Sequence, residues 1–226
     1  MDSVAERFSR CFNLTWEVDR GWAGVRFVVI DTEMTGLDPR FDRIVSIGAI
    51  PCIGVELHVD ATFEAYVRIS HNTSAVRLHG ITRELAEAWG AEESQVIAEF
   101  LDYLRDGIIV GHHVRHDVEM LELAAKRCWG IERLPNLVID TADLSLRLEE
   151  VGLLCQPHEQ EADYSLDGLC SRFGIPPHDR HTATGDAFLA AQVFMKLLKR
   201  ARRGGMLRLG ELTEPYHFGR ASDGDA

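Results

Sequence analysis

The sequence predicts an α/β fold in which a mixed β-sheet is flanked by helices. Short apolar or alternating segments come first, at residues 25–30, 43–50 and 62–69, and turn residues separate the first two. Helical periodicity then alternates with two further short strands, at residues 108–111 and 137–139. Three antiparallel strands followed by this alternation indicate a five-stranded sheet that continues with parallel strands.

Helices are predicted around the later strands. Thr82 suits the N-cap of a short helix that ends near Trp89, and Gly130 and Gly174 suit helix ends. Apolar residues recur at helical spacing in the segments between these signals. The predicted helices cover residues 82–89, 94–104, about 118–130, a segment ending at 148, 166–173 and 187–199.

Composition narrows the class of protein. The chain has 226 residues, of which 46% are hydrophobic and 27% charged, and this balance argues against disorder. Five cysteines without a C-x-x-C pair argue against a disulfide framework or a structural zinc site. Without a long apolar run or a signal peptide, we predict a soluble, cytoplasmic protein. The net charge of −12, taken alone, argues against a nucleic-acid substrate.

The chain is predicted to have three parts. Residues 25–203 form the main domain, residues 1–24 an N-terminal extension and residues 204–226 a C-terminal tail. Val4, Phe8, Cys11 and Phe12 recur at helical spacing, so residues 2–13 are predicted to form an amphipathic helix. That helix either docks on the core or binds a partner.

Two carboxylates end the first predicted strand. Asp31 and Glu33 are two residues apart, so in a strand they point to the same face. Carboxylates held a few ångströms apart repel one another unless a cation lies between them. Hard divalent cations such as Mg²⁺ and Mn²⁺ prefer oxygen ligands of this kind. The pair is therefore a candidate metal site, although two acids at a solvent-exposed strand end are common.

Two further acids come at helix starts. Asp117 follows the strand at 108–111, and Asp186 opens the alanine-rich last helix. An acid in a first helical turn also complements the helix dipole, so each signal is weak alone. His181 lies five residues before Asp186, and the two side chains converge only if His181 lies in the preceding loop.

Taken together and in this order, these residues resemble the DEDDh family of 3′–5′ exonucleases, which includes the proofreading subunit of bacterial replicative DNA polymerase. The resemblance covers residues 25–199 and implies a ribonuclease H-like fold. The matching segments are FVVIDTEMTGLDPRFDRIVSIGAI for the first motif, VGHHVRHDVEML for the second, HTATGDAFLAAQVF for the third, and HGIT at residues 79–82 for the loop on the substrate side.

The resemblance also implies a mechanism with two divalent metal ions, Mg²⁺ or Mn²⁺. It assigns Asp31, Glu33 and Asp186 to one ion. Asp31 would bridge to a second ion, which Asp117 supports partly through water. His181 is the implied general base, because an imidazole with a pKa of about 6.5 suits proton uptake near neutrality. The expected reaction removes nucleoside 5′-monophosphates from the 3′ end of single-stranded DNA.

The substrate pocket is also predicted from the resemblance. Met34, Thr35 and Leu37 follow the strand that carries the acids and are expected under the terminal base. His79 approaches from the HGIT loop, and His116 is expected in the same pocket. For Met34 the alternative is a core methionine.

The chain departs from the family at three pocket positions. The family usually has Thr where this chain has Met34, and commonly Asn and Phe where it has His113 and His116. These departures concern substrate preference rather than the metal ligands. Zinc bound by His112, His113 and His116 is an alternative that the carboxylate site disfavours.

Other functions remain open from the sequence. A 3′–5′ exoribonuclease of the same fold would carry the same motifs. His79, His116, Asp117 and Asp186 imitate the ligands of HD-type phosphohydrolases, but that family is entirely helical. A non-catalytic scaffold would lack at least one acid. The expected partners are single-stranded 3′ ends and a DNA polymerase or another replication or repair protein in trans, with no membrane.

The charge distribution qualifies the argument from net charge. Two divalent ions would offset the four site acids, so phosphate can approach an acidic chain. We expect contact with only a few nucleotides and a shallow salt dependence. The basic residues cluster late, at Lys196, Lys199, Arg200, Arg202, Arg203 and Arg208.

Overall fold

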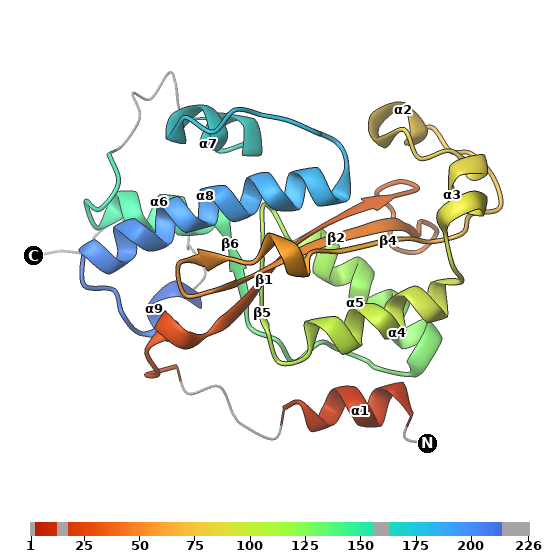
Figure 1. The fold of residues 1–226 in the computed structure, drawn as a ribbon, viewed down its shortest axis with the longest axis horizontal. Coiled ribbons are helices and arrows are strands. Elements are labelled where there is room, and N and C mark those ends of the chain that lie inside the picture. The colour runs from red at the N-terminus through yellow and green to blue at the C-terminus, as the bar shows by residue number, and fades with distance from the viewer. Residues whose placement is uncertain (1–2, 13–17, 156–162, 214–226) are drawn as a thin grey trace, which may run out of the picture.

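A computed structural model describes residues 3–12, 18–155 and 163–213. These residues form one six-stranded sheet with helices on both faces (Figure 1). The strands are β1 (Arg26–Met34), β2 (Ile44–Ile53), β3 (Glu56–Leu57), β4 (Phe63–Tyr66), β5 (Ile108–Gly111) and β6 (Val138–Asp140).

The strand order confirms the predicted mixed sheet. Its path is β3-β2-β1-β5-β6, and β4 also pairs with β2. β1 pairs with β2 antiparallel and with β5 parallel, and β6 continues the parallel part. The five predicted strands are present, and β3 is an addition of two residues, too short to leave a pattern in the sequence. β4 ends at Tyr66 rather than at residue 69, because Val67 turns to pair with Ala91.

Helices cover both faces of the sheet. The six predicted helices correspond to α3–α8, whereas α2 and α9 were not predicted. Two short 3₁₀ helices, η1 and η2, complete the elements. Their bounds are α1 (Val4–Arg10), η1 (Trp22–Gly24), η2 (Val59–Ala61), α2 (Val76–His79), α3 (Arg83–Trp89), α4 (Glu93–Leu104), α5 (Arg115–Trp129), α6 (Thr141–Glu150), α7 (Leu166–Phe173), α8 (Ala183–Arg203) and α9 (Leu209–Thr213).

The first turn of α8 begins four residues before the predicted start. Thr182 is the N-cap, and its hydroxyl oxygen accepts a hydrogen bond of 3.1 Å from the backbone N–H of Gly185. Such a cap satisfies a backbone donor that has no partner within the helix. Asp186 therefore lies in the first turn of α8, while His181 stays in the preceding loop.

Side chains of β1 alternate between two buried cores. Phe27 and Val29 pack in the core that α6, α7 and α8 cover, and Val28 and Ile30 pack in the core that α4 and α5 cover. Figure 1 shows α6, α7 and α8 on one side of the sheet and α1, α4 and α5 on the other. This two-residue period fixes the direction of the side chains that follow in the strand.

The predicted N-terminal helix docks on the core. α1 buries Val4 and Phe8 in the core beside α4, and Arg7 forms a 2.7 Å salt bridge with Asp102 of α4. A capping box between Ser3 and Glu6 begins the helix. Residues 2 and 13 of the predicted helix lie outside the described residues.

The folded core extends beyond both predicted domain boundaries. Trp22 is buried in the core beside α8, and its Nε1 donates a hydrogen bond of 2.8 Å to the Met206 carbonyl. Leu209 and Leu212 of α9 are buried in the same core. Residues 22–24 and 204–213 therefore pack with the domain that was predicted as residues 25–203. The rest of the predicted tail, 214–226, lies outside the described residues.

The cysteines and the apolar character of the helices can be compared with the expectations from composition. All five cysteines are free thiols. The sequence had argued against a disulfide framework. Within the described parts of the chain, no helix has the length and apolar character needed to cross a membrane. The cytoplasmic location stays a prediction.

Candidate active site

Three carboxylates meet where β1 ends. Asp31 and Glu33 share the strand face of Phe27 and Val29, which is the face that α8 covers. One carboxylate oxygen each from Asp31, Glu33 and Asp186 lies within 4.8 Å of the others. Glu33 and Asp186 are buried and Asp31 is half-buried. The structure thus brings together two residues of one strand and one from a helix more than 150 residues later.

A glycine permits the close approach of α8 to the sheet. Gly48 of β2 pairs with Asp31 across the strands. A Cβ atom at Gly48 would overlap the backbone of Ala183 and Thr184. The first turn of α8 therefore lies directly against β2, and this approach brings Asp186 to the carboxylates of β1.

Asp117 stands beside the cluster and is held by β1. The backbone N–H and the hydroxyl of Thr32 donate to Oδ1 of Asp117, at 2.9 and 2.7 Å. Asp117 lies in the first turn of α5, on the opposite side of the sheet from α8. The group within 4.8 Å is Asp31, Glu33 and Asp186, so Asp117 differs from the other three predicted ligands in its position.

The site carboxylates have raised pKa values. Burial, followed by repulsion from Asp117, Asp186 and Glu33, raises the pKa of Asp31 well above its usual range. Burial and the neighbouring acids Asp186 and Asp117 raise the pKa of Glu33 to about 7. Burial raises the pKa of Asp117 to about 6, although the hydrogen bonds from Thr32 act in the opposite direction. These directions mean that burial and mutual repulsion of the acids outweigh the positive charge near the cluster.

The donor set fits a divalent cation. The three clustered side chains offer only carboxylate oxygens, the ligands that Mg²⁺ and Mn²⁺ prefer. A bound cation would relieve the repulsion that raises their pKa values. Zinc sites with nitrogen or sulfur ligands need a different donor set.

His181 lies in the loop before α8, as the predicted convergence with Asp186 requires. Its backbone N–H donates a hydrogen bond of 3.2 Å to Oδ2 of Asp186. Its side chain is exposed, and its φ of 62° lies in the left-handed region. Such a φ in a residue other than glycine costs energy and often marks a functional segment.

Arg180, which was not predicted from the sequence, also contacts Asp186. Its Nη1 forms an ion pair with Oδ1 of Asp186. Its Nε and Nη2 lie 2.7 and 3.1 Å from the two carboxylate oxygens of Asp167. The signal that could have identified Arg180 is its position directly before His181, the first residue of the third motif.

A pocket of about 360 Å³ adjoins the carboxylates and gathers most of the predicted substrate residues. Met34, Leu37, His79 and His116 line it. Met34 is also part of the buried core, and its contact with the terminal base stays a prediction. The remaining lining residues are Asp31, Thr32, Glu33, Gly36, Ala75, Leu78, His113 and Asp117.

Thr35 is placed differently from the prediction. It lines a separate hollow of about 400 Å³ on the side of Phe41 and Arg43. Its hydroxyl donates to Oδ1 of Asp42 at 2.7 Å and accepts from the backbone N–H of Arg43 at 3.0 Å. Thr35 therefore shapes the turn between β1 and β2.

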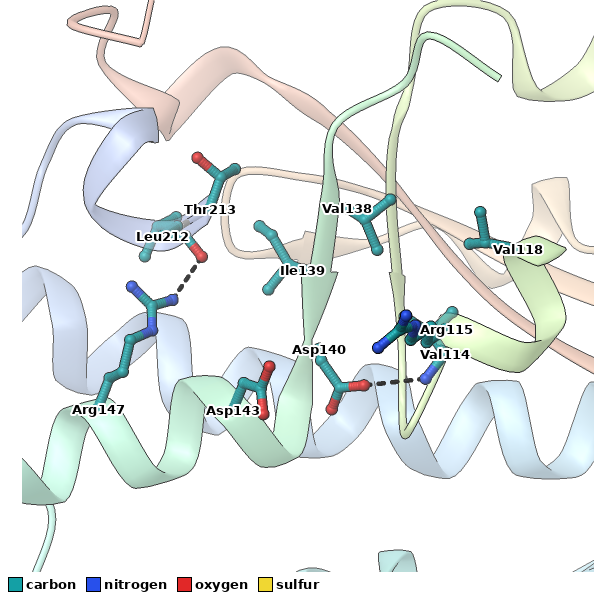
Figure 2. Close-up of a pocket in the computed structure, with 10 residues that line it drawn as sticks. All are labelled: Val114, Arg115, Val118, Val138, Ile139, Asp140, Asp143, Arg147, Leu212 and Thr213. Atoms are coloured by element: carbon teal, nitrogen blue, oxygen red, sulfur yellow. Dashed lines mark hydrogen bonds between the residues drawn. The ribbon is translucent and has the colours of Figure 1, made fainter. Parts of the chain in front are cut away.

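Another pocket lies at the β6 edge of the sheet. It has a volume of about 280 Å³ and lies between β6, α5, α6 and α9 (Figure 2). Arg147 donates a hydrogen bond of 2.6 Å to the Leu212 carbonyl, and the backbone N–H of Val114 donates one of 2.9 Å to Asp140. The residues predicted for catalysis do not line this pocket.

The sheet order and the carboxylates on its central strand define a ribonuclease H-like α/β protein. Escherichia coli exonuclease I in complex with a dT13 oligonucleotide has the same fold, with a TM-score of 0.67 and 20% sequence identity over 80% of this chain and 43% of that chain. The chain belongs to the exonuclease (RNase_T) family, whose model matches residues 28–194. This confirms the family predicted from the motifs.

Curated relatives are much longer proteins. DNA polymerase III PolC-type of Thermotoga maritima is 33% identical over 198 residues, which are 87% of this chain and 14% of that protein. The DNA polymerase III subunit epsilon-like protein of Rhodobacter capsulatus is 31% identical over 200 residues, 86% of this chain and 27% of that protein. The chain thus spans about a quarter or less of their lengths. The sheet also excludes the all-helical HD-type alternative.

Proposed function

We propose that this chain is a metal-dependent 3′–5′ exonuclease that acts on single-stranded DNA and releases nucleoside 5′-monophosphates. The observation that carries the proposal is the cluster of Asp31, Glu33 and Asp186 beside a pocket of about 360 Å³. Family membership supports exonuclease chemistry, and the names of the polymerase relatives support DNA as the substrate.

Each acid has a role in holding metal ions. Asp31, Glu33 and Asp186 would hold one Mg²⁺ or Mn²⁺ ion, and Asp31 with Asp117 a second. When bound, such ions activate water and stabilise negative charge on phosphate oxygens. Thr32 keeps the Asp117 carboxylate oriented through two hydrogen bonds.

His181 is the proposed general base. Its ring is exposed in the loop beside Asp186, so it can reach the water that attacks the phosphorus. The bond between phosphorus and the 3′-oxygen of the preceding nucleotide breaks. The released nucleotide then carries the 5′-phosphate, and the shortened strand keeps a 3′-hydroxyl.

The adjoining pocket is proposed to hold the 3′-terminal nucleoside. Met34 offers a buried apolar surface, while Leu37 and Leu78 are 81% and 61% exposed at its rim. Apolar side chains on both sides of a base favour stacking without reading its sequence. The terminal phosphodiester would then lie against the carboxylates.

The deciding experiment uses one oligonucleotide sequence, labelled at its 5′ or its 3′ end. We expect a ladder of shortened 5′-labelled products and immediate release of labelled mononucleotide from the 3′-labelled strand. Excess EDTA should stop both, and Mg²⁺ or Mn²⁺ should restore them. Asp31→Asn and Asp186→Asn should be inactive while their circular dichroism matches wild type. Cleavage that persists in EDTA or in either variant would contradict the proposal.

The same assay separates the proposed substrate from its alternative. Matched RNA and mismatched duplex DNA are digested beside the single-stranded DNA. Faster turnover of RNA would favour an exoribonuclease. The biological setting proposed for the chain is trimming of 3′ ends delivered by a DNA polymerase or another replication or repair protein. A stimulated rate on primed templates when such a polymerase is added would support that setting.

A further inference from the structure

Arg180 joins the starts of two helices at the carboxylate cluster. Asp167 lies in the first turn of α7, and Asp186 lies in the first turn of α8. The guanidinium uses Nε and Nη2 for the two oxygens of Asp167 and leaves Nη1 for Asp186. The planar guanidinium fits this arrangement because its donors form a fixed fork.

The guanidinium is the cation nearest to the site among the contacts that the structure describes. The Arg180 side chain is 22% exposed, between the 60% exposed Asp167 and the 10% exposed Asp186. Its positive charge also acts on Asp31 and Glu33, because it pairs with Asp186, whose carboxylate lies within 4.8 Å of theirs. Arg180 therefore offsets part of the repulsion among the three clustered acids.

The backbone around Arg180 is held in an unusual conformation. Asp179 and His181, its two neighbours, have φ angles of 49° and 62°. The Thr182 hydroxyl donates a hydrogen bond of 2.7 Å to the Asp179 carbonyl, which also lies where a Cβ of Gly185 would be. Left-handed backbone at two non-glycine residues persists only where surrounding contacts enforce it. These contacts present Arg180 to the site.

We propose that Arg180 is a positioning residue that serves as the resident counter-ion of the cluster: it holds Asp186 in place when no metal is bound and opposes the entry of a divalent cation. The inference rests on the proposed function, because it requires that Asp31, Glu33 and Asp186 bind metal. A cation and the guanidinium compete for the same carboxylate, and the pair with Asp167 retains Arg180 when the cation binds.

Substitutions at Arg180 and at Asp167 are expected to change the affinity for a divalent cation in opposite directions. Arg180→Gln removes the competing charge, so a divalent cation should bind more tightly. Asp167→Asn removes the second partner of the guanidinium and leaves Arg180 to neutralise Asp186, so the cation should bind more weakly. Damage to the local fold alone would weaken binding in both variants.

The test measures Mn²⁺ binding to the full chain by electron paramagnetic resonance, without nucleic acid. Arg180→Gln should lower the dissociation constant about tenfold, as a single charge a few ångströms from the ion allows. Asp167→Asn should raise it about threefold, and Arg180→Lys should fall between wild type and Arg180→Gln. Arg208→Gln is the matched control, since Arg208 pairs with Asp19 and Glu211 beyond the other end of α8. It should bind Mn²⁺ as wild type does.

A second readout follows the metal-free protein. In EDTA, Arg180→Gln should melt at a lower temperature than wild type, and Mn²⁺ should raise its melting temperature by more. Equal or weaker Mn²⁺ binding by Arg180→Gln would overturn the role of Arg180. Failure of wild type and all variants to bind Mn²⁺ would overturn the metal site, and with it the proposed function. The two failures are therefore distinguishable.

Discussion

Thr32 gives both its backbone N–H and its hydroxyl to a single oxygen of Asp117, at 2.9 and 2.7 Å. The residues are 85 positions apart, so this contact fixes the start of α5 against the end of β1. Thr32 lies between Asp31 and Glu33 in the strand and points to the other face. One three-residue segment thereby carries two site acids and orients a third.

Thr32→Val tests this support for Asp117. Valine keeps the shape of the side chain but removes the hydroxyl donor. Hydrogen bonds to charged groups contribute about 1.5–3 kcal/mol, so we expect kcat/KM on single-stranded DNA to fall by about tenfold or more. Thr62→Val is the control, because the Thr62 hydroxyl bonds the Val59 carbonyl on an exposed segment. An unchanged rate in Thr32→Val would mean that the backbone donor alone orients Asp117.

The parts of the site that follow local periodicity could be predicted from the sequence. The two-residue spacing of Asp31 and Glu33 fixes a shared face, and helix-start signals placed Asp117 and Asp186 in first turns. Arg180 could not be predicted in this way. Its role depends on how α7 and α8 lie in space, because Arg180 lies in the loop between them and its partner Asp167 is 13 residues away in α7.

In the fold as well, elements with a local periodic pattern could be predicted and long-range contacts could not. The strands and amphipathic helices with clear periods were predicted, whereas β3 has two residues and α2 has four. Trp22 and Leu209 were assigned to peripheral segments because nothing local shows that they are buried. Their burial comes from contacts such as that of Trp22 with Met206, 184 residues away. Long-range packing of this kind leaves no pattern within a short window.

The raised carboxylate pKa values predict a pH-dependent stability in EDTA. The pKa of Glu33 is raised from 4.5 to about 7, so the folded state binds more protons than the unfolded state between these values. Stability from this group is complete below about pH 4.5 and is lost as the pH rises through about 7. Asp117, with its pKa raised from 3.8 to about 6, acts in the same direction over a lower window.

We expect the metal-free protein to melt about 5 °C lower at pH 8 than at pH 5. Glu33→Gln should reduce this difference, because the amide carries no charge at either pH. Glu99→Gln, which changes an exposed carboxylate of α4, should leave it unaltered. Differential scanning fluorimetry measures all three proteins. A metal-free protein that is more stable at pH 8 than at pH 5 would contradict the assigned shifts.

Gly48→Ala should disturb the site from the opposite strand. The added Cβ overlaps backbone atoms of Ala183 and Thr184, which cannot move away as a flexible side chain could. We expect a loss of about 1–3 kcal/mol in the free energy of unfolding, measured with urea, as for other overpacked sites. Activity should fall further than stability explains, because the first turn of α8 carries Asp186. Gly24→Ala, where a Cβ meets no atom within 4 Å, is the control.

His181→Ala separates the proposed base from the metal ligands. The backbone N–H of His181 contacts Asp186 and survives the substitution. We therefore expect kcat to fall by about 10²–10⁴ while Mn²⁺ binding changes little. His178→Ala, an exposed histidine in the same loop, should retain activity. A His181→Ala rate within twofold of wild type would remove this residue from the role of base.

The basic end of α8 lies away from the site and should contribute little to substrate binding. Asp186 is in the first turn of α8, whereas Lys199, Arg202 and Arg203 are exposed in its last turns. At 1.5 Å per residue, Lys199 lies roughly 20 Å along the helix from Asp186, beyond a Debye length of about 8 Å at physiological salt. The triple variant Lys199→Gln, Arg202→Gln, Arg203→Gln should therefore change KM for a short oligonucleotide by less than about twofold.

The logarithm of kcat/KM should fall with the logarithm of salt concentration at a slope of about −1.5 to −2 in both wild type and the triple variant, as for two or three phosphate contacts. A steeper slope in wild type that the triple variant loses would show instead that the strand reaches this end of α8.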